Sequence, residues 1–161
     1  MAGINKIIII KLIFLISIFA LASAFFIEYV LGHQPCNLCV LERIPYLLAI
    51  IIFILNYKFV RLEKHFILLL ILIFLAAIIL SLYHLGIEQG FIEESLVCDL
   101  KDGSNLLSKE DILKQLQQKN VSCQDVTFKI FGLSLTSYNI IINLVLTLYL
   151  TKIYFGYEKN R

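Results

Sequence analysis

The sequence has few charged residues and few of the residues that make flexible linkers. Only 16% of its 161 residues are charged, against about 25% in a typical soluble domain. Two prolines and seven glycines leave no room for a long flexible linker. The scarcity of charge excludes an intrinsically disordered chain, a nucleic-acid-binding tail and most soluble enzymes.

Apolar residues dominate the composition instead. They make up 60% of the chain, and its mean hydropathy is +0.87. A soluble domain of this size could not hide so much apolar surface in one core, so we expect the surplus to face lipid. The length accommodates a single domain over residues 1–161.

Four apolar stretches approach the length needed to cross a bilayer. A hydrocarbon core about 30 Å thick needs about 20 residues of helix. In lipid each span must satisfy its own backbone polar groups, so all four are predicted to be helices. The predicted fold class is therefore all-α, a polytopic membrane protein with a four-transmembrane-helix bundle. Its spans are predicted at residues 7–27, 40–57, 66–87 and 130–151.

The first span has an alternative interpretation. Lys6, an apolar run and the small residues Ala22, Ser23 and Ala24 resemble a signal peptide with a cleavage site. Apolar residues continue past this site through 25–27, which suits a membrane span better than a cleaved leader.

The basic residues between the spans predict the orientation of the chain. The short loop 30–34 has no lysine or arginine, and the positive-inside rule therefore places it outside the cytoplasm. Both termini are then cytoplasmic, and the loops 28–39 and 88–129 lie outside. Eight basic residues fall on the cytoplasmic side: Lys6, Lys11, Lys58, Arg61, Lys64, Lys152, Lys159 and Arg161.

The long outer loop is predicted to carry a short amphipathic helix. Ser108 to Asp111 fits a capping box, and Ile112, Leu113 and Leu116 then form one apolar stripe. The helix lies either on the outer membrane surface or against the other loops, and the sequence favours neither.

The four cysteines are predicted to share one compartment outside the cytoplasm. Cys36 and Cys39 lie at the outer mouth of the second span, whereas Cys98 and Cys123 lie in the long outer loop. Two disulfides are expected there, with three possible connectivities. A C-x-x-C ring is a poor structural staple but suits redox switching. If Cys36 and Cys39 pair locally, Cys98 and Cys123 are left to close the outer loop.

Two further polar residues in the spans are candidates for a site. Arg43 follows Cys39 by one helical turn, and its positive charge would favour the reactive thiolate. Alternatively, Arg43 extends to the interface or pairs with Glu42. His84, near the outer end of the third span, could relay protons or simply rest at the interface.

Several segments together resemble the bacterial disulfide-bond formation protein B (DsbB) family. They are Pro35 to Cys39 followed by Glu42-Arg43, Tyr83 to Gly90, and Ser122-Cys123 followed by Phe131 to Ser134. The resemblance implies a thiol oxidase of the bacterial inner (cytoplasmic) membrane. Such a protein reoxidises a periplasmic thioredoxin-like dithiol carrier, DsbA-like, and passes the electrons to a membrane quinone, either ubiquinone or menaquinone.

The resemblance also implies roles for individual residues. The reduced carrier attacks the Cys98–Cys123 disulfide at Cys98 and forms a mixed disulfide. Cys123 is then free to attack the Cys36–Cys39 disulfide or to resolve the carrier, and Cys36 and Cys39 become reduced. The Cys39 thiolate then contacts the quinone beside Arg43. His84 is a weaker candidate for the quinone pocket. No metal and no nucleic-acid partner is expected.

Other classes of function remain open at this point. The chain could be a structural four-span membrane scaffold whose disulfides only brace its loops. The four cysteines could bind zinc, although Cys98 and Cys123 lack a paired spacing. The chain could also serve another quinone-linked thiol enzyme, such as the vitamin K epoxide reductase type, whose other motifs it does not match.

Overall fold

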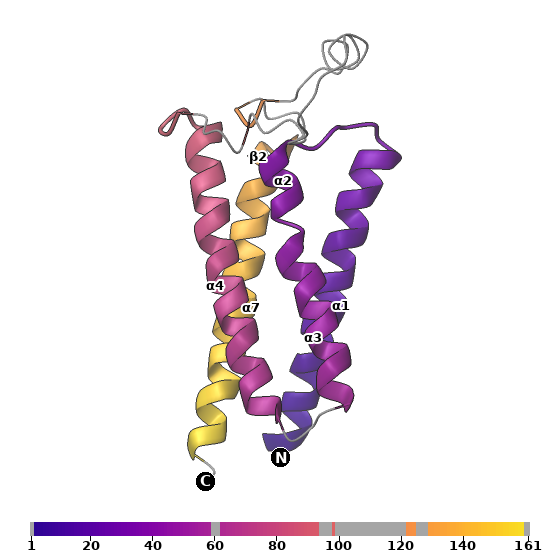
Figure 1. Ribbon diagram of the computed structural model, residues 1–161, viewed down its shortest axis with the longest axis vertical. Helices are drawn as coiled ribbons and strands as arrows, with labels where there is room; N and C mark the ends of the chain where they lie inside the picture. Colours follow the sequence, from indigo (N-terminus) through magenta and orange to yellow (C-terminus); the bar gives the residue numbers. More distant parts are fainter. Residues whose placement is uncertain (1, 59–61, 94–97, 99–121, 125–128, 160–161) are drawn as a thin grey trace, which may run out of the picture.

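The computed structural model describes residues 2–58, 62–93, 98, 122–124 and 129–159 (Figure 1). Within these residues, four helical stretches are long and apolar enough to cross a membrane, which confirms the predicted fold class. The elements are the helices α1 (Ala2–Tyr29), α2 (Asn37–Leu41), α3 (Ile44–Lys58), α4 (Glu63–Glu88) and α7 (Leu135–Lys159), with the strands β1 (Lys129–Ile130) and β2 (Leu133–Ser134).

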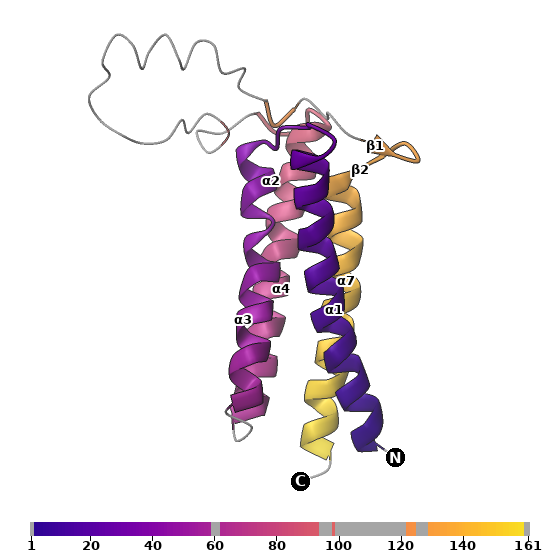
Figure 2. The same ribbon diagram turned by 90° about the vertical axis from the view of Figure 1, so that its right-hand side faces the viewer.

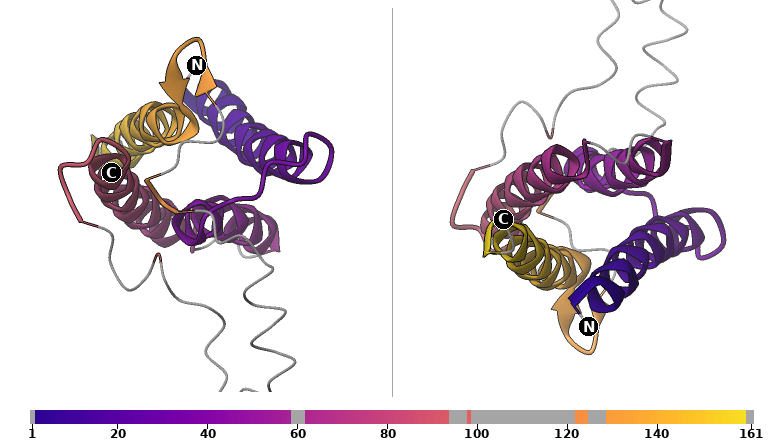
Figure 3. Two further views of the ribbon diagram at one scale, coloured as in Figure 1. Left: turned by 90° about the horizontal axis from the view of Figure 1, so that it is seen from above. Right: turned by 90° about the horizontal axis from the view of Figure 1, so that it is seen from below.

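The helices form an elongated bundle with two distinct ends. Helix α4 packs along α7, and α3 packs against both α1 and α4. Viewed along the bundle, the four spans stand around a common centre (Figure 3). Both termini lie at one end, and α2 lies at the other (Figure 1). We call the latter the cysteine end.

The apolar core occupies the half of the bundle nearer the termini. Phe74 is fully buried there and meets Tyr46 edge to face, with ring centroids 6.1 Å apart. Many large apolar side chains on the outer helix faces are exposed, as a lipid-facing surface requires. The buried cluster comprises Ile13, Tyr46, Ala49, Ile52, Ile67, Leu70, Ile71, Phe74, Leu146, Leu150 and Ile153.

The first helix is continuous through the small residues that resemble a cleavage site. Helix α1 runs past Ala24 to Tyr29, and its buried residues Ile13 and Ser17 face the bundle. In this structure α1 is therefore one of the four packed spans.

The second span is broken rather than continuous. Helix α2 ends at Leu41 and α3 begins at Ile44, with a turn at Glu42 and Arg43 between them. Pro45 explains the break, because it has no N–H to donate to the carbonyl of Leu41. The predicted span 40–57 thus covers the end of α2 and most of α3. From the turn between these helices, Glu42 reaches His84 of α4 and Arg43 reaches Glu28 of α1.

The start of the fourth span was predicted too early, at residue 130. Residues 129–134 form a small antiparallel hairpin, in which Lys129 pairs with Ser134 and Ile130 with Leu133. Both turn residues, Phe131 and Gly132, have positive φ angles, as a tight hairpin turn requires. The hairpin projects sideways from the cysteine end (Figure 2), and α7 begins only after it.

The amphipathic helix predicted after Ser108 lies outside the described residues, so it stays a prediction.

Candidate active site

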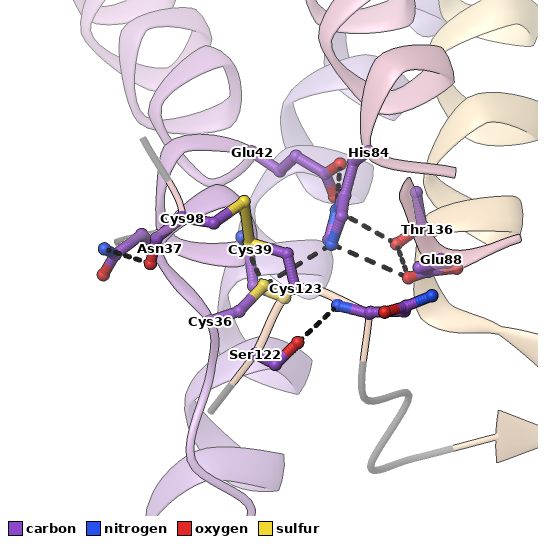
Figure 4. The surroundings of a disulfide bond; sticks show 11 residues. Cys36, Asn37, Cys39, Glu42, His84, Glu88, Cys98, Ser122, Cys123 and Thr136 are labelled. Atoms are coloured by element: carbon purple, nitrogen blue, oxygen red, sulfur yellow. Dashed lines mark hydrogen bonds and ion pairs between the residues drawn. A yellow bond between two sulfur atoms is a disulfide. The ribbon is translucent and has the colours of Figure 1, made fainter. Parts of the chain in front are cut away.

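All four cysteines gather at the cysteine end of the bundle (Figure 4). Cys36 caps the N-terminus of α2, where its sulfur accepts a hydrogen bond from the backbone N–H of Cys39 at 3.2 Å. Cys36 and Cys123 belong to one buried cluster, and Cys39 and Cys98 pack against it. The fold therefore brings the loop cysteines to the C-x-x-C segment, although they are distant in sequence.

The two cysteine pairs are in different redox states. Cys98 and Cys123 are joined by a disulfide, with their Cα atoms 5.9 Å apart. Cys36 and Cys39 are free thiols, so this structure lacks the second disulfide that the sequence led us to expect.

His84 connects Cys36 to a buried carboxylate. Its Nε2 atom lies 3.4 Å from the Cys36 sulfur, and its Nδ1 atom lies 2.9 Å from Glu42 Oε1. The side chain of His84 is only 1% exposed. A carboxylate can only accept, so Nδ1 carries a proton and Nε2 is the nitrogen that exchanges a proton with the sulfur.

Hydrogen bonds favour the thiolate form of Cys36. The Cys39 side chain has the largest effect, and His84 adds a hydrogen bond and a favourable charge. Together they outweigh burial and lower the pKa of the Cys36 thiol from 9.0 to about 5. At neutral pH Cys36 is therefore a thiolate, the form that reacts with disulfides.

A polar network between helices holds Glu42 in place. Asn139 of α7 donates to Glu42 Oε2 at 3.0 Å and to Ser81 Oγ of α4 at 2.9 Å. Its carbonyl oxygen accepts from Tyr46 and Asn143, so the whole amide is satisfied. Asn139 and Asn143 lie four residues apart on one face of α7, and that face turns toward the other helices.

Glu88, the last residue of α4, is buried beside His84. Its side chain is 6% exposed, and its Oε1 atom accepts a hydrogen bond from Thr136. The same oxygen lies 3.7 Å from His84 Nε2. The other oxygen, Oε2, has no hydrogen-bond partner among the residues that the structure describes.

Arg43 pairs with Glu28 of α1 and not with Glu42. Its guanidinium group also lies over the ring of Phe25, 5.1 Å from the centroid. Helix α1 brings Glu28 to the turn between α2 and α3, where its side chain is partly buried. The ion pair and the aromatic ring hold Arg43 at the edge of the cysteine site.

A cavity of about 380 Å³ joins these groups. Apolar side chains of α1 and α7, among them Phe19, Ile27 and Ile142, form much of its wall. Its size, apolar wall and few polar groups are typical of a site for a small organic molecule. The predicted site residues that line it are Cys36, Cys39, Arg43, His84 and Cys123, whereas Cys98 is not among the lining residues.

Glu42, Glu88 and Thr136 belong to the site but were not predicted from the sequence. A signal was present for Glu42, because a carboxylate within an apolar span is costly and marks a functional site by default. Thr136 and Glu88 gave no such signal, since their meeting depends on how α4 packs against α7.

Comparisons with known proteins show the family of this chain. The family described as "Disulfide bond formation protein DsbB" matches residues 6–153. The "Uncharacterized protein RP370" of Rickettsia prowazekii (strain Madrid E) is 34% identical over 152 residues, which are 91% of this chain and 86% of that protein. No solved structure matches the chain.

Proposed function

This chain belongs to the disulfide bond formation protein DsbB family, and from that premise we propose that it oxidises a thioredoxin-like dithiol carrier and passes the electrons to a membrane quinone. The observation that carries this proposal is the meeting of two cysteine pairs beside one cavity. One pair is bonded and the other is reduced, which is the state left after electrons have passed from the loop pair to Cys36 and Cys39.

The first half of the reaction is disulfide exchange at Cys98 and Cys123. A carrier thiolate attacks Cys98, forms a mixed disulfide and releases Cys123 as a thiolate. The second carrier thiol then displaces Cys98, which leaves the carrier oxidised and the loop pair reduced. The reduced loop pair next exchanges with a Cys36–Cys39 disulfide. This exchange regenerates Cys98–Cys123 and leaves Cys36 and Cys39 as a dithiol, the state that the structure has.

The second half of the reaction is oxidation of Cys36 and Cys39. His84 holds the proton that Cys36 releases, and Glu42 orients His84 by accepting from Nδ1. When the Cys36–Cys39 bond forms, two electrons leave together with the proton of Cys39 and the proton on His84. A membrane quinone supplies the acceptor for two electrons and two protons.

The residues that line the cavity fit such a quinone. Its wall on α1 is mainly apolar, like the ring and tail of a quinone, and α7 adds the apolar side chains of Leu135 and Ile142 among polar ones. Arg43, Cys39 and His84 would hold the ring end. The family resemblance assigns the direct contact to Cys39, which lines the cavity with Arg43.

We place the protein in the bacterial inner membrane with both termini in the cytoplasm and the cysteines on the periplasmic side. The separation of the cysteine end from both termini supports this placement (Figure 1). The basic residues beside the termini and in the joint after Lys58 support it as well.

The experiment is a coupled assay with purified protein in detergent. A reduced thioredoxin-like carrier and a short-chain ubiquinone or menaquinone are added, and we expect carrier disulfide and quinol in equal amounts. Cys39→Ser should abolish turnover, whereas His65→Ala, which alters an exposed residue of α4, should not change it. Unchanged turnover in Cys39→Ser would contradict the mechanism. A Cys98–Cys123 bond that resists reduced carrier at any ratio would favour the bracing scaffold.

A further inference from the structure

Three metal-binding side chains converge at the inner cysteine pair. The sulfur atoms of Cys36 and Cys39 and a ring nitrogen of His84 all lie within 4.8 Å of one another. Cys36 is buried and Cys39 is half-buried. Figure 4 shows the three side chains pointing toward one another from α4 and from the start of α2.

The spacing of these donor atoms suits a tetrahedral metal ion. With Zn–S at about 2.3 Å and Zn–N at about 2.0 Å, a tetrahedral ion separates sulfur from nitrogen by about 3.5 Å. The Cys36 sulfur lies 3.4 Å from His84 Nε2. Two thiolates and one imidazole are also a known zinc ligand set, with a fourth position left over.

The surroundings of His84 match those of a metal-binding histidine. Such a histidine almost always donates its other ring N–H to a carboxylate or another oxygen, which fixes the ring and the tautomer. Here Nδ1 faces Glu42 Oε1 at 2.9 Å and the Thr136 hydroxyl at 3.2 Å. Nε2 is thereby left pointing at the sulfur of Cys36.

Glu88 offers a ligand for the fourth position. Its carboxylate lines the same cavity, and one of its oxygens lies 3.7 Å from His84 Nε2. The other oxygen is buried without a hydrogen-bond partner among the described residues. Burying an unpaired carboxylate oxygen is costly. Glu88 is not in the group whose ligand atoms all lie within 4.8 Å of one another, so its carboxylate would have to turn toward the ion to ligate it.

We propose that reduced Cys36 and Cys39 bind Zn²⁺ together with His84, with Glu88 completing the site. Binding transfers no electrons, and two protons go to solvent: the thiol proton of Cys39 and the proton that His84 Nε2 holds for the Cys36 thiolate. The oxidised pair cannot bind, because its sulfurs are no longer thiolates. Cys98 and Cys123 take no part, since they are joined in their own disulfide. Given the proposed function, bound Zn²⁺ holds the pair reduced and inhibits the oxidase reversibly.

Zn²⁺ binding is measured on a variant in which Cys36 and Cys39 are the remaining cysteines, Cys98→Ala/Cys123→Ala. We expect one equivalent of Zn²⁺ on the reduced protein, measured by competition with a chromophoric chelator. Co²⁺ should give a thiolate-to-metal charge-transfer band at the same site. After diamide has oxidised Cys36 and Cys39, the same polypeptide should bind neither ion. Equal binding before and after oxidation, or none in the reduced protein, overturns the proposal.

Further variants, made in the Cys98→Ala/Cys123→Ala protein, test whether His84 is a Zn²⁺ ligand. Glu42→Gln keeps the shape of the side chain but weakens the support of His84, so we expect Zn²⁺ affinity to fall about 10- to 100-fold. His84→Ala removes a ligand and should cost more than about 100-fold. His65→Ala is the matched control, because His65 is exposed on the same helix, and its affinity should equal that of the background. Equal affinity in His84→Ala and His65→Ala also overturns the proposal.

Inhibition is measured separately from binding. In the otherwise unmodified oxidase, turnover should fall in proportion to Zn²⁺ occupancy and return after the chelator is added. Zn²⁺ that binds without reducing turnover overturns the inhibitory role. If the protein shows no thiol–quinone turnover in the absence of zinc, the proposed function fails, while the equilibrium binding result stands by itself.

Discussion

At Cys36 the hydrogen-bond partners decide the charge of a buried sulfur. Burial alone raises the pKa of a thiol, because it disfavours the charged form. The hydrogen bonds from Cys39 and His84 act in the opposite direction and prevail, giving a pKa of about 5. The reactivity of Cys36 should therefore depend on its two neighbours and not on exposure.

The pH dependence of alkylation tests this thiolate. In reduced Cys98→Ala/Cys123→Ala protein, the rate at Cys36 should be constant above neutral pH and fall as the pH drops through about 5. Cys39→Ala removes the largest cause of the shift, so the midpoint should move up toward 9.0. Alkylation at each site is followed by peptide mass spectrometry. A midpoint near 9.0 before Cys39 is changed would mean that Cys36 is an ordinary thiol.

Arg43 should matter for quinone use rather than for carrier binding. It lines the cavity and is held by Glu28 and the ring of Phe25. In Arg43→Ala we expect the KM for a short-chain quinone to rise about 10-fold, equivalent to about 1.4 kcal/mol. Steady-state kinetics with each substrate varied in turn measure this. Lys64→Ala is the control, because it also removes a cation from an aromatic ring, that of Tyr154, but Lys64 does not line the cavity. Equal quinone KM values in both variants would remove Arg43 from the pocket.

The sequence predicted which residues lie at the site better than it predicted their partners. Cys36, Cys39, Arg43 and His84 share one cavity, as their positions at one end of the spans indicated. Their partners come from other helices, and the spacing of residues along the chain does not predict which helices pack together. Arg43 meets Glu28 across the bundle, whereas the adjacent Glu42 turns inward to His84.

Among the elements, α7 stabilises the site through one amide. Asn139 makes hydrogen bonds to the charged Glu42, to Ser81 and to Tyr46. Asn139→Leu breaks them and leaves a buried carboxylate short of a donor, so the free energy of unfolding should fall by about 1–3 kcal/mol. Reversible unfolding in mixed detergent micelles, followed by helical circular dichroism, measures the loss.

Asn56→Leu is the matched control for Asn139→Leu. The Asn56 side-chain oxygen is buried and has no hydrogen-bond partner in the described part of the chain. Its replacement should change the free energy of unfolding by less than about 0.5 kcal/mol or increase it. Equal losses in the two variants would show that the network around Asn139 contributes no particular stability.

The bounds of a membrane helix could be predicted from the sequence where hydropathy alone determines where the helix begins and ends. The first and third spans match α1 and α4 closely, because lipid permits only helices along apolar runs. The fourth span was misplaced at its start because Ile130, Phe131 and Leu133 are as apolar as a span, yet they form a hairpin. The second span was predicted as one segment, 40–57, whereas the structure has α2 end at Leu41 and α3 begin at Ile44.

The whole molecule has one reactive end and one basic end. The cysteines lie opposite both termini (Figure 1), and the short basic segments lie beside the termini and after Lys58. Phosphatase reporters that are active only outside the cytoplasm should be active when fused after Gly90. They should be inactive when fused after Lys58 or Arg161. The reverse pattern would place the cysteines in the reducing cytoplasm and contradict an oxidase role.

A single-turnover reaction tests the proposed link between the cysteines and the quinone most directly. Reduced Cys98→Ala/Cys123→Ala protein, in which only Cys36 and Cys39 can react, is mixed with one equivalent of a short-chain quinone. Quinol is followed by absorbance, and the cysteines are mapped by mass spectrometry. We predict one quinol per protein and an intramolecular Cys36–Cys39 disulfide. Thiols that stay free while the quinone stays oxidised would contradict the proposed electron transfer.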